Sequence, residues 1–177
     1  LPVKACTAEE YKEIPDVILV CIKGYSMDET VPTIKKIAGK ETVVIPILNI
    51  YGTGGRLQKK LPELTVTDGC IYVSANIMEP GVILQHGKIL RVVFGARKPE
   101  EETEKMREVA KDMVTDDLEV ILSENIRRDA MVKFSYVSPI GAAGLYCNAV
   151  AADFQREGEQ REMFKALIRE IVALSHA

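Results

Sequence analysis

The sequence has little of what marks a nucleic-acid, metal or membrane protein. Its 23 Lys and Arg residues are outnumbered by 26 Asp and Glu residues, so it has no general attraction for a phosphate backbone, and no nucleic-acid partner is expected. Only two histidines occur, His86 and His176, far apart and outside any cluster of cysteines and carboxylates, which argues against a protein-built metal site. No apolar run approaches the roughly 20 residues that span a bilayer, and no signal segment opens the chain, so no membrane partner is expected.

Cysteine is scarce and is not arranged for metal binding or disulfides. The four cysteines, Cys6, Cys21, Cys70 and Cys147, show no C-x-x-C spacing, and two of them lie in apolar runs where free thiols pack as small hydrophobes. We therefore expect reduced thiols and a cytoplasmic protein. The length of 177 residues, with 47% hydrophobic and 28% charged residues, suits one substantial core or one domain plus part of a second.

Strand-like and helix-like patterns alternate in the first part of the chain. Asp16–Lys23 and Val43–Asn49 are short, apolar and rich in β-branched residues, as in strands buried on both faces. The segment between them begins at Ser26 or Asp28, has apolar residues at helical spacing and stops at Gly39. This pattern predicts a β-α-β unit with parallel strands and a right-handed crossover.

The α/β pattern continues to about residue 123. A short helix is expected after the glycines at 52–55, ending at Pro62, and a charged helix is expected to start at Pro99. The extended segments are Cys70–Ile77, Val82–Gln85, Ile89–Phe94 and Glu119–Leu122. The tight His86–Lys88 connection predicts a hairpin between the second and third of these segments.

From Asn125 onward the pattern is helical only. Two long helices are expected, over Asn125–Tyr146 and Glu157–Ala177, and the second carries an apolar stripe from Phe164 to Leu174. The shift near Ser123 predicts a domain boundary, with residues 1–123 in an α/β domain and residues 124–177 in a helical one.

Two polar side chains end the two apolar strands, and they are the first candidates for a ligand site. Ligands of open parallel sheets collect at the carboxyl ends of the strands, where Lys23 and Asn49 are expected to face one crevice. A solvated lysine and an asparagine that caps its turn are the alternatives, and position alone favours the solvated lysine. Glycines follow both residues and permit close approach of a ligand.

Lys133 is the third candidate. On the first long helix, Ile126, Ala130, Lys133 and Val137 recur at helical spacing, which places a cation within an apolar stripe. Such a lysine either extends its ammonium to solvent at the edge of the apolar stripe or is retained for function. Periodicity alone favours neither interpretation.

Four segments together resemble one family. DVILVCIKGYSM, ILNIYGTGGRL, GCIYVSANIMEPGVILQHGKILRVVFG and NIRRDAMVKFSYVSPIG occur in the order and spacing of ketopantoate reductases (2-dehydropantoate 2-reductases). The resemblance implies the later strands of a Rossmann-like NADP-binding domain, followed by the first helices of an all-α substrate and dimerisation domain.

The resemblance also implies roles for individual residues. Lys23 would lie beside cofactor and substrate, Asn49 beside the nicotinamide and the substrate, and the Ala75 backbone beside NADP. Lys133 would bind a small 2-keto acid and act as the general acid of its reduction.

The sequence departs from the family in two respects. Val137 and Gly141 stand where the family usually has substrate-binding asparagines, so another 2-keto acid, or a non-catalytic interaction or regulatory module, remains an alternative. No G-x-G-x-x-G precedes the first strand and the chain starts at Leu1, which suggests an internal piece, inactive alone, of a longer enzyme that can form homo-oligomers.

Overall fold

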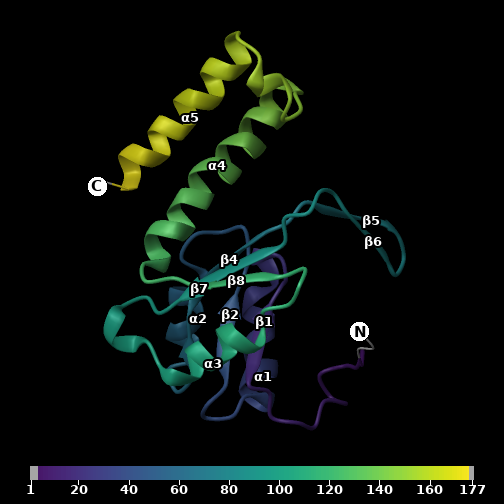
Figure 1. Ribbon diagram of the computed structural model, residues 1–177, viewed down its shortest axis with the longest axis vertical. Helices are drawn as coiled ribbons and strands as arrows, with labels where there is room; N and C mark the ends of the chain where they lie inside the picture. The colour runs from purple at the N-terminus through teal and green to yellow at the C-terminus, as the bar shows by residue number, and fades with distance from the viewer. Residues whose placement is uncertain (1–3, 176–177) are drawn as a thin grey trace. The chain divides into compact units, whose positions relative to one another are not determined.

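The structure, a computed structural model, describes residues 4–175, and the chain divides into two compact units between residues 127 and 128. The fold is α/β: a parallel Rossmann-like sheet with helices, followed by two long C-terminal helices (Figure 1). The fold class predicted from the sequence is confirmed. Within residues 4–175, we find no helix with the length and apolar character that crossing a bilayer requires.

The first sheet has three parallel strands. β1 (Val17–Val20), β2 (Val43–Pro46) and β3 (Thr65–Val66) lie in that order, with β2 in the centre. Helix α1 (Met27–Ile37) connects β1 to β2, and helix α2 (Thr53–Lys60) connects β2 to β3. This is the predicted β-α-β unit extended by a further helix and strand.

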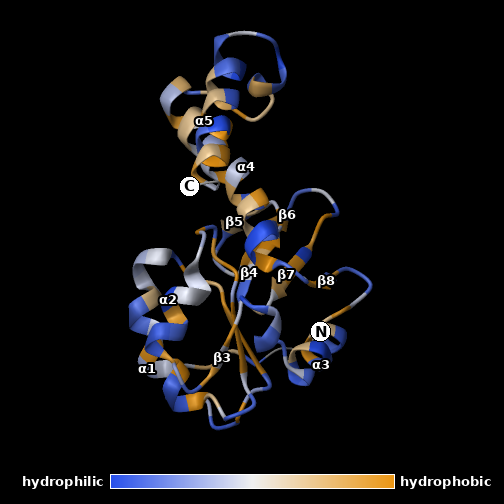
Figure 2. Ribbon diagram, turned by 90° about the vertical axis from the view of Figure 1, so that its left-hand side faces the viewer, coloured by the Kyte–Doolittle hydropathy of each residue, from blue (hydrophilic) through white to orange (hydrophobic). Residues whose placement is uncertain are grey.

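Both faces of β2 are buried, and each face packs into a different core. Val44 packs with Met27 of α1 and Leu57 of α2 on one face. Ile45 packs with Phe94 and the second sheet on the other. A strand covered on both sides has no solvated face to alternate with, which explains its continuous apolar run. Figure 2 shows hydrophobic ribbon in the strands beside β3.

The second sheet joins β4 (Asp68–Tyr72), β7 (Arg91–Gly95) and β8 (Glu119–Leu122), with β7 in the middle. β4 and β7 are antiparallel, whereas β7 and β8 are parallel. Between β7 and β8 lies helix α3 (Glu104–Asp112), whose Met106 and Val109 complete the core between the sheets.

The charged helix begins later than the sequence predicted. Pro99 starts only a 3₁₀ turn, Pro99–Glu101 (η2), and α3 begins at Glu104. The Thr103 hydroxyl caps α3 by accepting the Met106 N–H at 3.3 Å. A side-chain acceptor satisfies one of the unpaired donors of a first helical turn, and Pro99 offers none.

The predicted hairpin is wrong in its partners. β6 (Val82–Gln85) pairs antiparallel with β5 (Ala75–Glu79), not with the segment after His86. Each of the two candidate turns contains a glycine with positive φ, Gly81 at 82° and Gly87 at 76°. The residues of the turns therefore do not show which of the two forms the hairpin. β7 is largely buried and pairs with β4, whereas every residue of β5 and β6 is exposed.

The second compact unit consists mainly of α4 (Ile126–Cys147) and α5 (Glu159–Ser175), as the helical pattern predicted. A short 3₁₀ segment, η3 (Asp153–Gln155), lies between them. The ring of Phe164 contacts those of Tyr136 and Phe154, with centroids 5.9 and 5.2 Å apart. Residues 176 and 177, the predicted end of the last helix, lie outside the described range.

Candidate functional site

The carboxyl ends of β1 and β2 lie side by side. Val20 and Pro46, the last residues of the two strands, are paired in register. Lys23 lies three residues after Val20, and Asn49 lies three residues after Pro46. The two residues therefore occupy equivalent positions after neighbouring strands, as predicted. Both side chains are exposed. This edge is where open parallel sheets bind ligands.

The two turns that follow these strands are in direct contact. A Cβ built on Gly24 would lie 2.2 Å from Cδ1 of Ile50, so the backbone after Lys23 lies against the side chain after Asn49. The structure therefore brings the Lys23 and Asn49 turns together. Sequence reasoning gave Ile50 no role in the site. The usable signal was that Gly24 and Ile50 each come directly after a strand-end polar residue.

The glycines that follow Asn49 have different tasks. Gly52 has φ of 75° at the N-cap of α2, and a Cβ there would meet no atom within 4 Å. Glycine is favoured at this position by the positive φ and not by a lack of room for a side chain. A Cβ on Gly54 would lie 2.0 Å from the Thr67 carbonyl oxygen. Gly54 therefore allows α2 to pack on the start of β4, which differs from the ligand approach inferred from the sequence.

A buried carboxyl holds the start of α2. Asp68, only 8% exposed, accepts the backbone N–H of Gly54 through Oδ1 at 2.7 Å. Burial raises the pKa of Asp68, while the Gly54 N–H and the positive charges of Arg97 and Arg127 act in the opposite direction. Sequence reasoning missed this residue, because an aspartate before an apolar strand reads as an ordinary turn residue.

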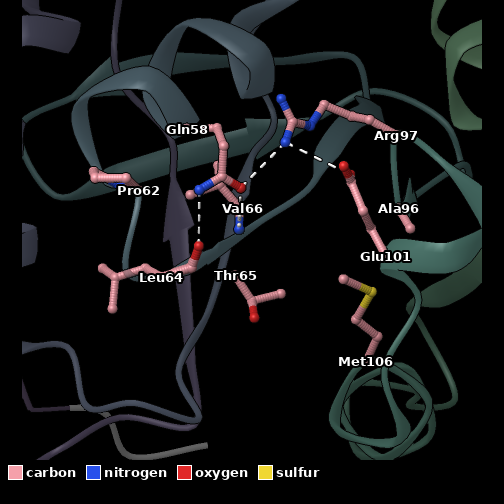
Figure 3. A pocket seen from close by; sticks show the side chains of 9 residues that line it. All are labelled: Gln58, Pro62, Leu64, Thr65, Val66, Ala96, Arg97, Glu101 and Met106. Carbon is pink, nitrogen blue, oxygen red and sulfur yellow. Dashed lines mark hydrogen bonds and ion pairs between the residues drawn. The ribbon is translucent and has the colours of Figure 1, made fainter.

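The far end of α2 is held by a second polar group, shown in Figure 3. The Gln58 amide donates to the carbonyls of Leu61 and Leu64, while its oxygen accepts the Val66 N–H at 3.3 Å. The same oxygen accepts a hydrogen bond from Arg97 Nη2 at 3.1 Å. Gln58, Leu64, Val66 and Arg97 are among the residues that line a recess of about 420 Å³. None of the site residues predicted from the sequence lines it.

Ala75 and Lys133 occupy other parts of the fold. Ala75 is exposed and is the first residue of β5, paired with Gln85, rather than the end of the strand that begins near Cys70. Lys133 lies on α4 within the second compact unit and is half-buried. Of its predicted stripe, Ile126 is fully buried and Ala130 and Val137 are half-buried, as an apolar stripe with an inserted cation requires.

The parallel sheet, the polar residues at its carboxyl edge and the glycine turn together define a Rossmann-type α/β protein. A model of the family described as "Ketopantoate reductase PanE/ApbA" matches residues 1–99, more than half of the chain. The chain belongs to this family of oxidoreductases.

Individual relatives agree with this assignment. The chain is 22% identical over 172 residues to the 2-dehydropantoate 2-reductase of Aquifex aeolicus, covering 97% of this chain and 56% of that protein. The crystal structure of 2-dehydropantoate 2-reductase from Porphyromonas gingivalis W83 matches with a TM-score of 0.82 and 27% identity, over 94% of this chain and 56% of the other.

A third similarity concerns the fold alone. The ternary structure of D-mandelate dehydrogenase with NADH and anilino(oxo)acetate matches with a TM-score of 0.83 at 17% identity, over 96% of this chain and 54% of that one. The chain thus spans about half the length of the relatives it matches.

Proposed function

We propose that the whole protein is an NADPH-dependent reductase of a small 2-keto acid, with reduction of 2-dehydropantoate to pantoate, a step of pantothenate biosynthesis, as the first candidate. The observation that carries the proposal is the contact between the Lys23 and Asn49 turns at the carboxyl edge of the sheet, in a chain of this family. In this proposal residues 1–123 belong to the NADP-binding domain and residues 124–177 to the helical substrate and dimerisation domain of a cytoplasmic, homo-oligomeric enzyme.

The carboxyl edge of the first sheet fits a nicotinamide cofactor. Lys23 supplies a cation and Asn49 an amide, which suit the phosphate and carboxamide groups of such a ligand. Gly24 lets the first turn pack against Ile50, and Gly52 supplies the positive φ of the second turn. We assign Lys23, Asn49 and the Ala75 backbone to cofactor binding, and Lys23 and Asn49 also to the substrate.

Lys133 is the proposed general acid. When bound, NADPH supplies the hydride that reduces the C2 carbonyl of the keto acid. The Lys133 ammonium stabilises the negative charge on the carbonyl oxygen and gives that oxygen its proton. Its partial burial within an apolar stripe supports this role, because a half-buried ammonium interacts with a substrate charge more strongly than a fully solvated one.

A second candidate substrate is a 2-keto acid without the hydroxyl group of ketopantoate. Val137 and Gly141 favour it, because neither side chain can hydrogen-bond a substrate hydroxyl or carboxylate. The D-mandelate dehydrogenase that shares this fold was solved with anilino(oxo)acetate, which supports testing aromatic and aliphatic 2-keto acids together.

The test is NADPH consumption by the whole protein with a panel of 2-keto acids that includes 2-dehydropantoate. We expect turnover with at least one of them, and the ratio of kcat/KM values identifies the preferred substrate. NADPH binding without turnover of any 2-keto acid would contradict the proposal and favour the non-catalytic module.

A further inference from the structure

The glycine turn of the proposed cofactor site is fixed at both ends. On the strand side, the Ile47 N–H donates to the Val20 carbonyl at 3.2 Å, which prolongs the pairing of β2 with β1 up to the turn. On the helix side, the Gly54 N–H donates to Asp68 Oδ1. Only Leu48–Thr53 lies between, including Gly52 with its positive φ.

The position of Gly54 is fixed in both directions. A closer approach would bring its backbone into a steric clash, and a move away from Asp68 would break its hydrogen bond. Its Cα lies against the Thr67 carbonyl, where even one added carbon would meet the oxygen at 2.0 Å. Its N–H is a first-turn donor of α2, which has no partner within the helix and needs an acceptor from elsewhere. Asp68 supplies that acceptor from a buried position.

We propose that Asp68 is a positioning residue of the cofactor site: by holding the Gly54 N–H, its carboxyl fixes the Asn49–Gly54 turn in the conformation that receives the nicotinamide end of the cofactor. The inference rests on the proposed function, because it assigns Asp68 to the same site. Asp68 acts through the turn and does not itself touch the ligand.

The other contacts of α2 do not supply this function. Gln58, held by Arg97, lies about one turn of the helix beyond Gly54. Arg97 also places its Nη1 near Gly55, at 3.5 Å from a built Cβ, and its charge partly opposes the rise that burial causes in the pKa of Asp68. Loss of the Asp68 acceptor would therefore release the first turn of α2 while the rest of the helix stays attached.

The experiment compares NADPH binding by the wild type, Asp68→Ala and Asp68→Asn, with Asp112→Ala at the exposed end of α3 as the control. Asp68→Ala removes the acceptor and should weaken NADPH binding by roughly tenfold. A loss of this size corresponds to the net free energy of about one hydrogen bond to a charged group. Asp68→Asn keeps an oxygen at the same place and should stay within about threefold of the wild type. Asp112→Ala should bind as the wild type does.

A second measurement needs no variant and covers the case in which Asp68→Ala does not fold. Hydrogen exchange of the Gly54 amide in the wild type should be slow before NADPH is added, because the turn is already held. Exchange at the rate of an open amide would overturn the proposal, and so would an Asp68→Ala protein that folds and binds NADPH like the wild type. A wild-type protein that binds no NADPH would instead contradict the proposed function itself.

Discussion

Two adjacent glycines of α2 show how close packing can resemble a ligand-binding motif. Gly54 and Gly55 follow Asn49 and Gly52 as a glycine-rich loop would, and the sequence gives both the same interpretation. The structure separates them, because a Cβ on Gly54 would meet the Thr67 carbonyl at 2.0 Å, whereas one on Gly55 meets only Arg97 Nη1 at 3.5 Å. The first is required for packing and the second is not.

Alanine substitutions at these glycines should therefore have opposite effects. Gly54→Ala forces α2 away from the Thr67 backbone and should lower the free energy of unfolding by about 2 kcal/mol or more. Gly55→Ala makes an ordinary contact in a helix and should raise it by up to about 1 kcal/mol. Thermal unfolding of the two variants checks this, and equal shifts of Tm would mean that Gly54 is not packed as described.

Asp68 should also give stability a defined pH dependence. Its pKa in the folded chain is raised, chiefly by burial, so the folded state holds the proton more tightly than the unfolded state. The stability gained from the protonated form is complete below the unfolded-state pKa and is lost as pH rises through the folded-state pKa.

Asp68→Asn removes this titration and serves as the reference. The difference in unfolding free energy, wild type minus Asp68→Asn, should fall as pH rises across that window and then level off. Urea unfolding at a series of pH values measures the difference. A difference that increases with pH would show that Arg97, Arg127 and the Gly54 N–H outweigh burial.

At the scale of elements, sequence periodicity predicted most strands and helices but not their pairing. The bounds of β8 and β6 were predicted as observed, and those of α2 and α4 to within a few residues. Strand partners were not predictable, because two glycine turns of equal quality flank β6 and only burial of β7 decides between them. For the site, strand ends located Lys23 and Asn49, whereas Asp68 acts through a contact across fourteen residues that no local pattern reveals.

The β5–β6 hairpin should be the least protected part of the sheets. All of its residues are exposed, including Ile77 and Ile83, which face each other across the two strands. Isolated two-stranded hairpins are marginally stable in water, so its amides should exchange at least about 100-fold faster than those of the buried β2 strand. Hydrogen exchange followed by mass spectrometry or NMR measures both. Equal protection would mean that another surface covers the hairpin in solution.

At the scale of the whole molecule, apolar side chains remain exposed in both compact units. Ile83 is 72% exposed in the first unit, and Leu145 and Leu174 are 89% and 72% exposed in the second. β1 is an edge strand of the sheet formed by the described residues, with Leu19 40% exposed. Exposed apolar surface and open strand edges favour association.

We therefore expect the chain to self-associate as its concentration rises. Light scattering over a dilution series should show a mass above that of one chain, and added salt should not dissolve the complex, because apolar contacts are insensitive to screening. Leu174→Ser should shift the equilibrium toward single chains, and Thr115→Ser, on the exposed loop before β8, serves as the control. A single-chain mass at every concentration would contradict this expectation.

The role of Lys133 in keto acid reduction is the central claim, and the most direct measurement is the steady-state kinetics of Lys133→Ala in the whole protein. We predict that kcat and kcat/KM for the 2-keto acid fall by about 100-fold to 10,000-fold, as for loss of a general acid. NADPH affinity should stay nearly unchanged, whereas Lys23→Ala should weaken it. A Lys133→Ala protein with wild-type turnover would contradict the account.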